Sequence, residues 1–158
     1  MKKNLIFLFI VFSFGLQAQN HAEWVEEYEK LEVEFHYGKY YQCNLSIEAL
    51  LRKMTKKNRC SEYVVITRAL KLKYRSALGM RQTNDSILNS LIKEWELNSE
   101  NYSDSVQIIG NLVFASAAYS YNKYGPALRF LSRAESKINE QSDPDGYWNQ
   151  KIKVAKME

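Results

Sequence analysis

The sequence has 158 residues, of which 46% are hydrophobic and 13% aromatic, so it can bury a globular core and is not typical of a disordered chain. Six glycines and two prolines exclude a collagen-like or linker-dominated chain, and two cysteines exclude a disulfide-framed miniprotein. The formal net charge of +4 at pH 7 is too small to indicate a nucleic-acid partner.

Residues 1–18 have the features of a secretory signal peptide. Two lysines near the start precede an uncharged, almost wholly apolar run over 5–16. A helix that spans a bilayer needs about 20 apolar residues, so this run fits a cleaved signal better than the alternative, an uncleaved anchor. We expect cleavage before Gln19, which leaves a single domain over 19–158, periplasmic or extracellular, without a transmembrane segment.

Hydrophobic residues then recur three or four positions apart through almost the whole remaining chain, which is the period of an α-helix. No stretch alternates with period two for long enough to indicate a strand. The pattern predicts an all-α fold. In chain order, the seven expected helices carry these apolar stripes: Trp24, Tyr28, Leu31, Phe35; Tyr40, Cys43, Ile47, Leu50, Met54; Tyr63, Ile66, Leu70, Tyr74, Ala77; Leu88, Ile92, Trp95; Ile109, Val113, Ala117; Ala127, Leu131, Ala134, Ile138; Trp148, Ile152, Ala155.

Several residues mark where these helices begin and end. Gly79 predicts the end of the third helix, Asp85 is a candidate cap of the fourth, and Ser103 or Asp104 opens the fifth. The pair Asp143-Pro144 predicts the start of the seventh.

Two short segments also resemble the acceptor motif for O-glycosylation of exported proteins in some bacteria. They are Asp85-Ser86-Ile87 and Asp104-Ser105-Val106. Both stand where helices begin, and Asp or Ser is favoured there simply as a cap for free N–H groups. Capping is the preferred interpretation.

Three helix pairs resemble tetratricopeptide-type (TPR-like) helical repeats, in which a turn aromatic is followed by small residues that let helices approach closely. The best match is Tyr121-Asn122-Lys123-Tyr124-Gly125-Pro126-Ala127, preceded by Phe114, Ala115 and Tyr119 and followed by Leu131 and Ala134. The first pair is similar, with Phe35, Gly38-Lys39-Tyr40, Cys43, Ile47 and Leu50. The middle pair, with Leu88, Ile92 and Trp95, fits only the apolar spacing.

The resemblance implies about three antiparallel helix-turn-helix repeats plus a C-terminal capping helix. Cys43, Leu88 and Ala127 recur at intervals of 45 and 39 residues, whereas a regular tetratricopeptide array repeats every 34. Leu31 also stands where the first helix of such a repeat carries a small residue. An irregular helical bundle is the alternative architecture.

The predicted helices keep the two cysteines apart. Cys43 begins the second helix and Cys60 the third, so they stand at opposite ends of an antiparallel pair. Seventeen residues at about 1.5 Å each separate them by about 25 Å, beyond the roughly 7 Å limit between the Cα atoms of a disulfide. We expect both to be unbridged.

Charge is distributed unevenly over residues 19–158, with a net of −5 over 19–51, +9 over 52–81 and −2 over 82–158. Arg68, Lys71 and Arg75 share one face of the third helix. They either pair with the acidic first helix or form a basic patch for an anionic partner or lipid. Local pairing is the preferred interpretation.

The tyrosines at two helix turns are candidate contacts. We assign Tyr40 and Tyr124 to packing, because turn aromatics in a repeat array lock helices together. Tyr41 and Tyr121 are out of phase with the apolar stripes, so we expect them to be exposed. Together with Arg68, Lys71 and Arg75 they form the candidate partner-binding set.

Motifs that indicate catalysis or a cofactor are absent from the sequence. His21 and His36 stand outside any metal-ligand pattern, and no nucleophile elbow, phosphate loop or dinucleotide fingerprint occurs. We expect no cofactor and no metal. The sequence favours a non-catalytic protein-protein interaction module of the bacterial cell envelope with a protein partner. The alternatives are a glycan- or small-ligand-binding helical domain and a small envelope enzyme with acidic catalytic residues.

Overall fold

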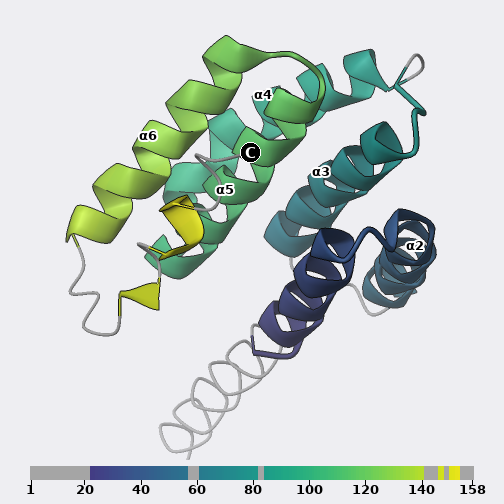
Figure 1. Ribbon diagram of the computed structural model, residues 1–158. Helices are drawn as coiled ribbons and strands as arrows, with labels where there is room; N and C mark the ends of the chain where they lie inside the picture. The colour runs from purple at the N-terminus through teal and green to yellow at the C-terminus, as the bar shows by residue number, and fades with distance from the viewer. Residues whose placement is uncertain (1–21, 57–60, 82–83, 141–145, 148–149, 154–158) are drawn as a thin grey trace, which may run out of the picture. The chain divides into compact units, whose positions relative to one another are not determined.

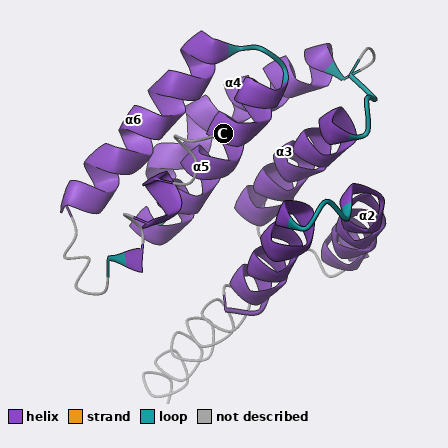
Figure 2. Ribbon diagram, in the orientation of Figure 1, coloured by secondary structure: helices purple, strands orange, loops and turns teal. Residues whose placement is uncertain are grey.

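The computed structural model describes residues 22–56, 61–81, 84–140, 146–147 and 150–153 (Figure 1). Every regular element in these ranges is helical, and Figure 2 shows helices joined by loops throughout them. The all-α fold predicted from the hydrophobic spacing is therefore confirmed. The predicted signal peptide lies outside the described residues, as does most of the predicted seventh helix.

The chain divides into two compact units, residues 1–39 and 40–158. In the first unit, residues 22–36 form one helix. Its predicted stripe is buried at Trp24, Tyr28 and Leu31, and the rings of Trp24 and Tyr28 stack with their centroids 5.4 Å apart. These residues are four and three positions apart, which places them on one buried face of the helix.

The second unit contains the remaining helices. They are α2 (Tyr40–Lys56), α3 (Ser61–Ala77), α4 (Asp85–Asn98), the 3₁₀ turn η1 (Ser99–Asn101), α5 (Asp104–Ser120) and α6 (Tyr124–Glu140). The predicted elements match these bounds closely. Asp85 is the first residue of α4 and not its cap, because Asn84 holds the N-cap position; the Asn84 amide donates to the Met80 carbonyl at 2.8 Å instead of capping.

Three helices end with the same hydrogen-bond pattern around a residue with positive φ. These residues are Gly38 (φ 75°), Gly79 (φ 78°) and Asn122 (φ 60°). The N–H of each of these residues donates to the carbonyl of the residue three positions before it, at 2.9 to 3.0 Å. The N–H of the residue that follows donates to the carbonyl five positions before itself, at 2.9 to 3.1 Å. This arrangement is the Schellman motif, which glycine and asparagine favour because they tolerate the left-handed conformation. The predicted role of Gly79 is confirmed.

Helix α5 is central to the second unit. It packs against α3, α4 and α6, and Figure 1 shows it lying between α3 and α6. Twelve of its 17 residues are buried. A helix that is apolar on nearly all sides requires neighbours on nearly all sides, which explains why the other helices of this unit are arranged around it.

Specific contacts fix the directions of the two most closely packed hairpins. Near one end of the α2–α3 pair, Glu48 contacts Arg75, and near the other the Thr67 hydroxyl lies 3.7 Å from the Met54 sulfur. The helices therefore run antiparallel. The α5–α6 pair is antiparallel too, with Lys137 beside Asp104 at the start of α5 and the ring of Phe130 against that of Phe114.

The indole of Trp95 joins α4 to α5. Its Nε1 donates to Asn111 Oδ1 at 3.0 Å, and its ring centroid lies 5.3 Å from that of Phe114 and 5.6 Å from that of Tyr102. Trp95 is fully buried, and its six-membered ring occupies the space that a Cβ on Gly110 would need. The missing side chain on α5 is what admits the indole.

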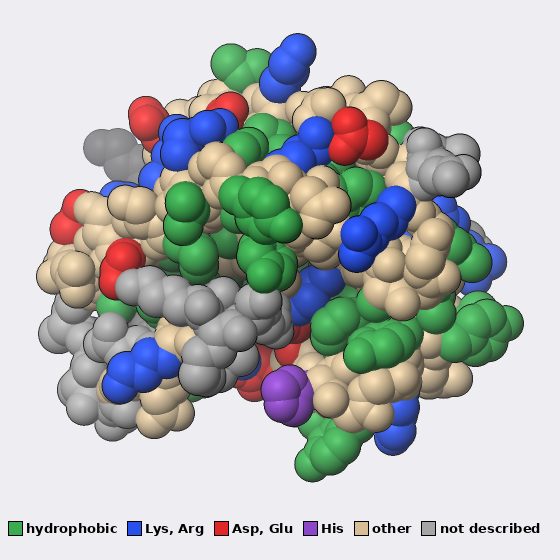
Figure 3. Space-filling view, turned by 45° about the horizontal axis from the view of Figure 1, so that its top comes forward, with side chains coloured by type: hydrophobic (Ala, Val, Ile, Leu, Met, Phe, Trp, Pro, Cys, Tyr) green, Lys and Arg blue, Asp and Glu red, His purple; other side chains and the backbone are tan. Residues whose placement is uncertain are grey.

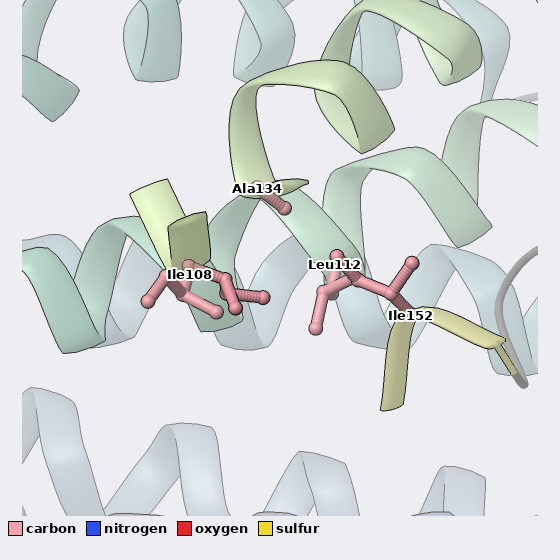
Figure 4. Close-up of a cluster of buried hydrophobic side chains, with 5 residues drawn as sticks. Ile108, Leu112, Ala134 and Ile152 are labelled. Carbon is pink, nitrogen blue, oxygen red and sulfur yellow. The ribbon is translucent and has the colours of Figure 1, made fainter. Parts of the chain in front are cut away.

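A second apolar cluster lies between α5, α6 and the helical segment 150–153 (Figure 4). Leu131 packs against it from α6. Its buried members are Ile108, Leu112, Ala134, Ile138 and Ile152. Ile152 thus covers apolar surface of α5 and α6, as the capping role of the predicted seventh helix requires. Trp148 and Ala155, also assigned to that helix, lie outside the residues whose side chains are described.

Replacing Gly110 with alanine tests the contact with Trp95. The new Cβ would overlap the indole far inside van der Waals distance, so either the ring or α5 must move. We expect Gly110→Ala to lower the free energy of unfolding by about 3 kcal/mol, as overpacked cores do. Urea denaturation followed by Trp fluorescence measures the change.

Gly125→Ala is the matched control. Gly125 also lies in a helix, α6, but nothing stands within 4 Å of the position that its Cβ would take. We expect a change within about 1 kcal/mol in either direction, since the gain in helix propensity is offset by the following proline. Equal losses in the two variants would contradict the proposed role of Gly110.

Candidate functional site

The basic face of α3 meets a carboxylate of α2. Glu48 Oε1 lies 3.0 Å from Lys71 Nζ and 3.3 Å from Arg75 Nη2. Lys71 and Arg75 are four residues apart, so one turn of α3 presents both cations to the same acceptor. The three side chains are each about a quarter to a third exposed.

This arrangement changes the acidity of Glu48. Its pKa is lowered, chiefly by the hydrogen bond and charge of Lys71 and further by Arg75, against a smaller opposing effect of burial. The carboxylate is therefore charged at neutral pH and holds two cations. A single negative charge neutralises only one of them, so the cluster retains a net positive charge.

The structure separates the candidate basic residues that the sequence groups together. Lys71 and Arg75 share Glu48, whereas Arg68 is exposed on α3. Lys71 and Arg75 are thus paired locally, but their acid is Glu48 of α2, whereas the predicted partners were the acids of the first helix. Glu48 was missed as a partner, although it is the only acidic residue between Glu34 and Glu62.

Helix α2 presents an apolar stripe to solvent. Tyr41 is 66% exposed, as expected, and Leu45, one turn further on, is 43% exposed. Ala49 and Arg52 continue this face at helical spacing and are exposed as well. The stripe therefore ends in a basic side chain. Figure 3 shows, for one face of the molecule, hydrophobic side chains at the surface with basic side chains among them.

The predictions for Tyr121 and Tyr124 are wrong. Tyr121 is only 9% exposed, whereas Tyr124 is 55% exposed and meets Tyr119 edge to face, with the ring centroids 5.5 Å apart. The reason is the turn between α5 and α6. Because Asn122 adopts the left-handed conformation, the helical phase of α5 does not continue into α6, so counting along one helix misplaces both rings. Tyr40, also assigned to packing, is 36% exposed.

A second exposed apolar patch lies at the start of α6. It consists of Tyr119, Tyr124 and Leu128, the last of which is 67% exposed. The arginines nearby, Arg129 and Arg133, both reach Glu96 of α4, at 3.6 and 3.7 Å. The charge beside this patch is thus shared with an acid, whereas Arg52 at the end of the α2 stripe forms no ion pair with another described residue.

Polar groups surround the buried ring of Tyr121. Its hydroxyl makes no hydrogen bond to another described residue. Burial raises the pKa of Tyr121, whereas Asn84 and the positive charges of Arg75 and Arg81 act in the opposite direction. The phenol is therefore neutral and can donate a hydrogen bond.

The described residues contain no group of three or more His, Cys, Asp or Glu side chains that could hold a metal ion. His36 is exposed, and His21 lies outside the described residues. Cys43 is buried and forms no disulfide with another described residue. Its predicted distance from Cys60 is not measurable here, because Cys60 lies in the segment 57–60, which is not described.

Comparison with known proteins adds no relative: the chain matches no family model, no curated protein and no solved structure. Within the described ranges, no helix is both long enough and apolar enough to cross a bilayer. The structure therefore defines the class, an all-helical protein, and its surfaces must carry any inference about function.

Glu48→Gln tests the charged contact between α2 and α3. Because the pKa of Glu48 is lowered by folding, its contribution to stability is present above the unfolded pKa, about 4.3, and is lost as the pH falls through the lower folded value. At pH 7 we expect the variant to be less stable by about 0.5 kcal/mol, the scale of a partly exposed ion pair. Thermal unfolding at pH 7 and pH 3 measures both values.

Glu94→Gln serves as the control, because Glu94 is exposed on α4 with no ion pair to another described residue. This substitution should leave the stability of the protein nearly unchanged at either pH. A stability difference for Glu48→Gln that does not become smaller between pH 7 and pH 3 would show that the carboxylate charge is not the cause.

Proposed function

We propose that this chain is an exported, non-catalytic protein-protein interaction module of the bacterial cell envelope, built from about three TPR-like helix pairs. In this proposal the second unit contains two whole pairs, α3 with α4 and α5 with α6, and α2 is the second helix of the repeat that precedes them in the chain. The mature domain binds a protein partner through exposed side chains, without a cofactor and without chemistry of its own.

The recurrence of one helix ending carries the proposal. The residues with positive φ that end the helix 22–36, α3 and α5 are Gly38, Gly79 and Asn122, which are separated by 41 and 43 residues. In all three cases the same pair of hydrogen bonds closes the helix, and another helix follows. A near-constant period in local geometry is typical of repeat proteins, and it is more regular than the apolar spacing in the sequence.

The packing within the second unit agrees with this pairing. Helices α3 and α5, the first members of their pairs, pack on each other, and each contacts the second member of its own pair. Each also contacts the second helix of the preceding pair, α2 for α3 and α4 for α5. Stacked helix pairs produce these neighbours, since each pair covers an apolar face of the one before.

The exposed stripe of α2 is the best candidate for the binding surface. Tyr41 supplies an amphipathic ring and Leu45 an apolar anchor, while Arg52 supplies a charge at the end of the stripe. Aromatic and arginine side chains are the residues that most often dominate binding energy in interfaces. Arg68, also exposed, is the member of the basic set that Glu48 does not hold.

Export is tested by the mass of the protein. We expect the full-length gene product, tagged at its C-terminus and expressed in a bacterial host, to be recovered outside the cytoplasm. Intact-mass spectrometry should show the loss of residues 1–18, because the apolar run is short enough for cleavage. An unprocessed product that stays with the membrane would instead indicate an uncleaved anchor.

The α2 stripe is tested with Leu45→Glu. A charge in the centre of an apolar contact should reduce the recovery of a specific partner by at least tenfold in affinity capture from the envelope fraction. Quantitative mass spectrometry measures the recovery, and circular dichroism checks that the helical content is unchanged.

Leu128→Glu makes the same change in the patch on α6, which is exposed to a similar or greater degree. It should leave recovery of the partner unaltered. If no protein is enriched by the unmodified chain, the interaction role fails. If both variants lose the partner equally, the role stands but the α2 stripe is not the surface.

A further inference from the structure

A polar cluster lies where the C-terminal ends of α3 and α5 meet. The Ser76 hydroxyl donates to the Ser120 carbonyl at 2.8 Å, and Arg81 Nε donates to Ser76 Oγ at 2.8 Å. Tyr121 follows Ser120 directly, and Arg75 precedes Ser76. The positive charges of Arg75 and Arg81 both act on the buried phenol of Tyr121.

Two donors in this cluster are unused. The Tyr121 hydroxyl and Arg75 Nε are both buried, and neither makes a hydrogen bond to another described residue. Asn84 lies close enough to lower the pKa of Tyr121, but its contact with the hydroxyl does not have the geometry of a hydrogen bond, and its amide nitrogen donates to the Met80 carbonyl. A buried donor without an acceptor is unfavourable, so a group that accepted both bonds would bind with a gain in free energy.

The cluster also has more positive than negative charge. Arg75 shares Glu48 with Lys71, so this carboxylate is already divided between two cations. Arg81 donates to a neutral hydroxyl. Asp85, the acidic residue nearest to Arg81 in the sequence, pairs with Lys123 at 2.8 Å. An anionic acceptor is therefore favoured over a neutral one.

We propose that this cluster is an oxyanion site, in which a phosphate or a carboxylate accepts hydrogen bonds from the Tyr121 hydroxyl and from the guanidinium groups of Arg75 and Arg81. Arg81 is exposed and Arg75 is 32% exposed, so the anion can approach from solvent. It replaces Ser76 Oγ as the acceptor for Arg81, because a charged acceptor makes the stronger bond, and displacement of that arginine opens the way to the hydroxyl.

The phenol suits this role. A phenol is already protonated at neutral pH and burial raises the pKa of Tyr121 further, so the hydroxyl donates and does not repel the anion. The site does not depend on the proposed protein partner, since a small anion alone would fill it. Its ligand is defined by charge and by the number of acceptor oxygens, and the two classes of oxyanion are separated by the titration below.

Titration of the purified protein with inorganic phosphate, and separately with acetate, tests the site. The signal is the chemical shift of the Tyr121 ring in protein carrying ¹³C-labelled tyrosine, assigned by its absence in Tyr121→Phe. Sodium chloride at matched ionic strength corrects for screening. We expect a saturable shift with at least one of the two anions, and whichever binds more tightly identifies the class.

Variants decide whether the named donors bind the anion. Tyr121→Phe removes only the unpartnered hydroxyl and should fold normally, and Arg81→Gln removes one charge at the exposed edge. Each should weaken binding at least fivefold, as followed by the phosphate- or acetate-dependent rise in Tm. Tyr124→Phe, which removes an exposed hydroxyl of the neighbouring turn, should leave it unchanged.

A ring signal that moves no more with phosphate or acetate than with sodium chloride would overturn the proposal. Binding that survives in both Tyr121→Phe and Arg81→Gln would overturn it equally, since the anion would then lie elsewhere. Loss of the partner captured through the α2 stripe has no bearing on either result, so the two proposals fail separately.

Discussion

The attachment of α4 to α5 depends on the contact between the Trp95 indole and the backbone of α5 at Gly110. A fully buried tryptophan of α4 lies where α5 has no side chain at all, and its one polar atom donates a hydrogen bond to Asn111 of α5. Burial of an indole provides a large favourable transfer free energy, but only if the N–H finds an acceptor. Adjacent positions of α5 thus supply the space and the acceptor together. This explains why a polar Asn111 is tolerated among buried residues of α5 that, apart from Gln107, carry no polar side chain.

The Schellman endings set the second constraint, which is where the chain reverses. Each one satisfies carbonyl groups that the last helical turn leaves open and redirects the backbone within two residues. Tight reversals make consecutive helices antiparallel neighbours, and the apolar stripes then determine which faces meet. Helix position in this protein therefore follows from local backbone geometry as much as from the hydrophobic core. The same geometry determines where side chains leave the last turn, so it also defines the polar cluster around Tyr121.

How far the sequence predicts this molecule differs between helices and turns. The stripes of α2, α3 and α6 identify core residues such as Cys43, Ile66 and Ala134, all of which are fully buried, because within a helix the 3.6-residue period leaves little freedom. The period carries no information across a turn. For this reason the predicted exposures of Tyr121 and Tyr124 are the reverse of those observed. Nor does spacing within one helix identify partners on another: the register of α2 against α3 brings Glu48 to Lys71 and Arg75, and that register depends on packing along the whole pair.

Cys43 provides a way to observe how this structure moves. Its thiol is completely covered although it stands near the start of α2, next to the exposed Tyr41 face. A thiol reagent can reach Cys43 only when that part of α2 separates transiently from its surroundings. The rate at which the Cys43 thiol is modified therefore reports the frequency of that opening. The modification rate of Cys43 thus measures how often α2 opens, and a ligand that holds this helix in place would slow the modification.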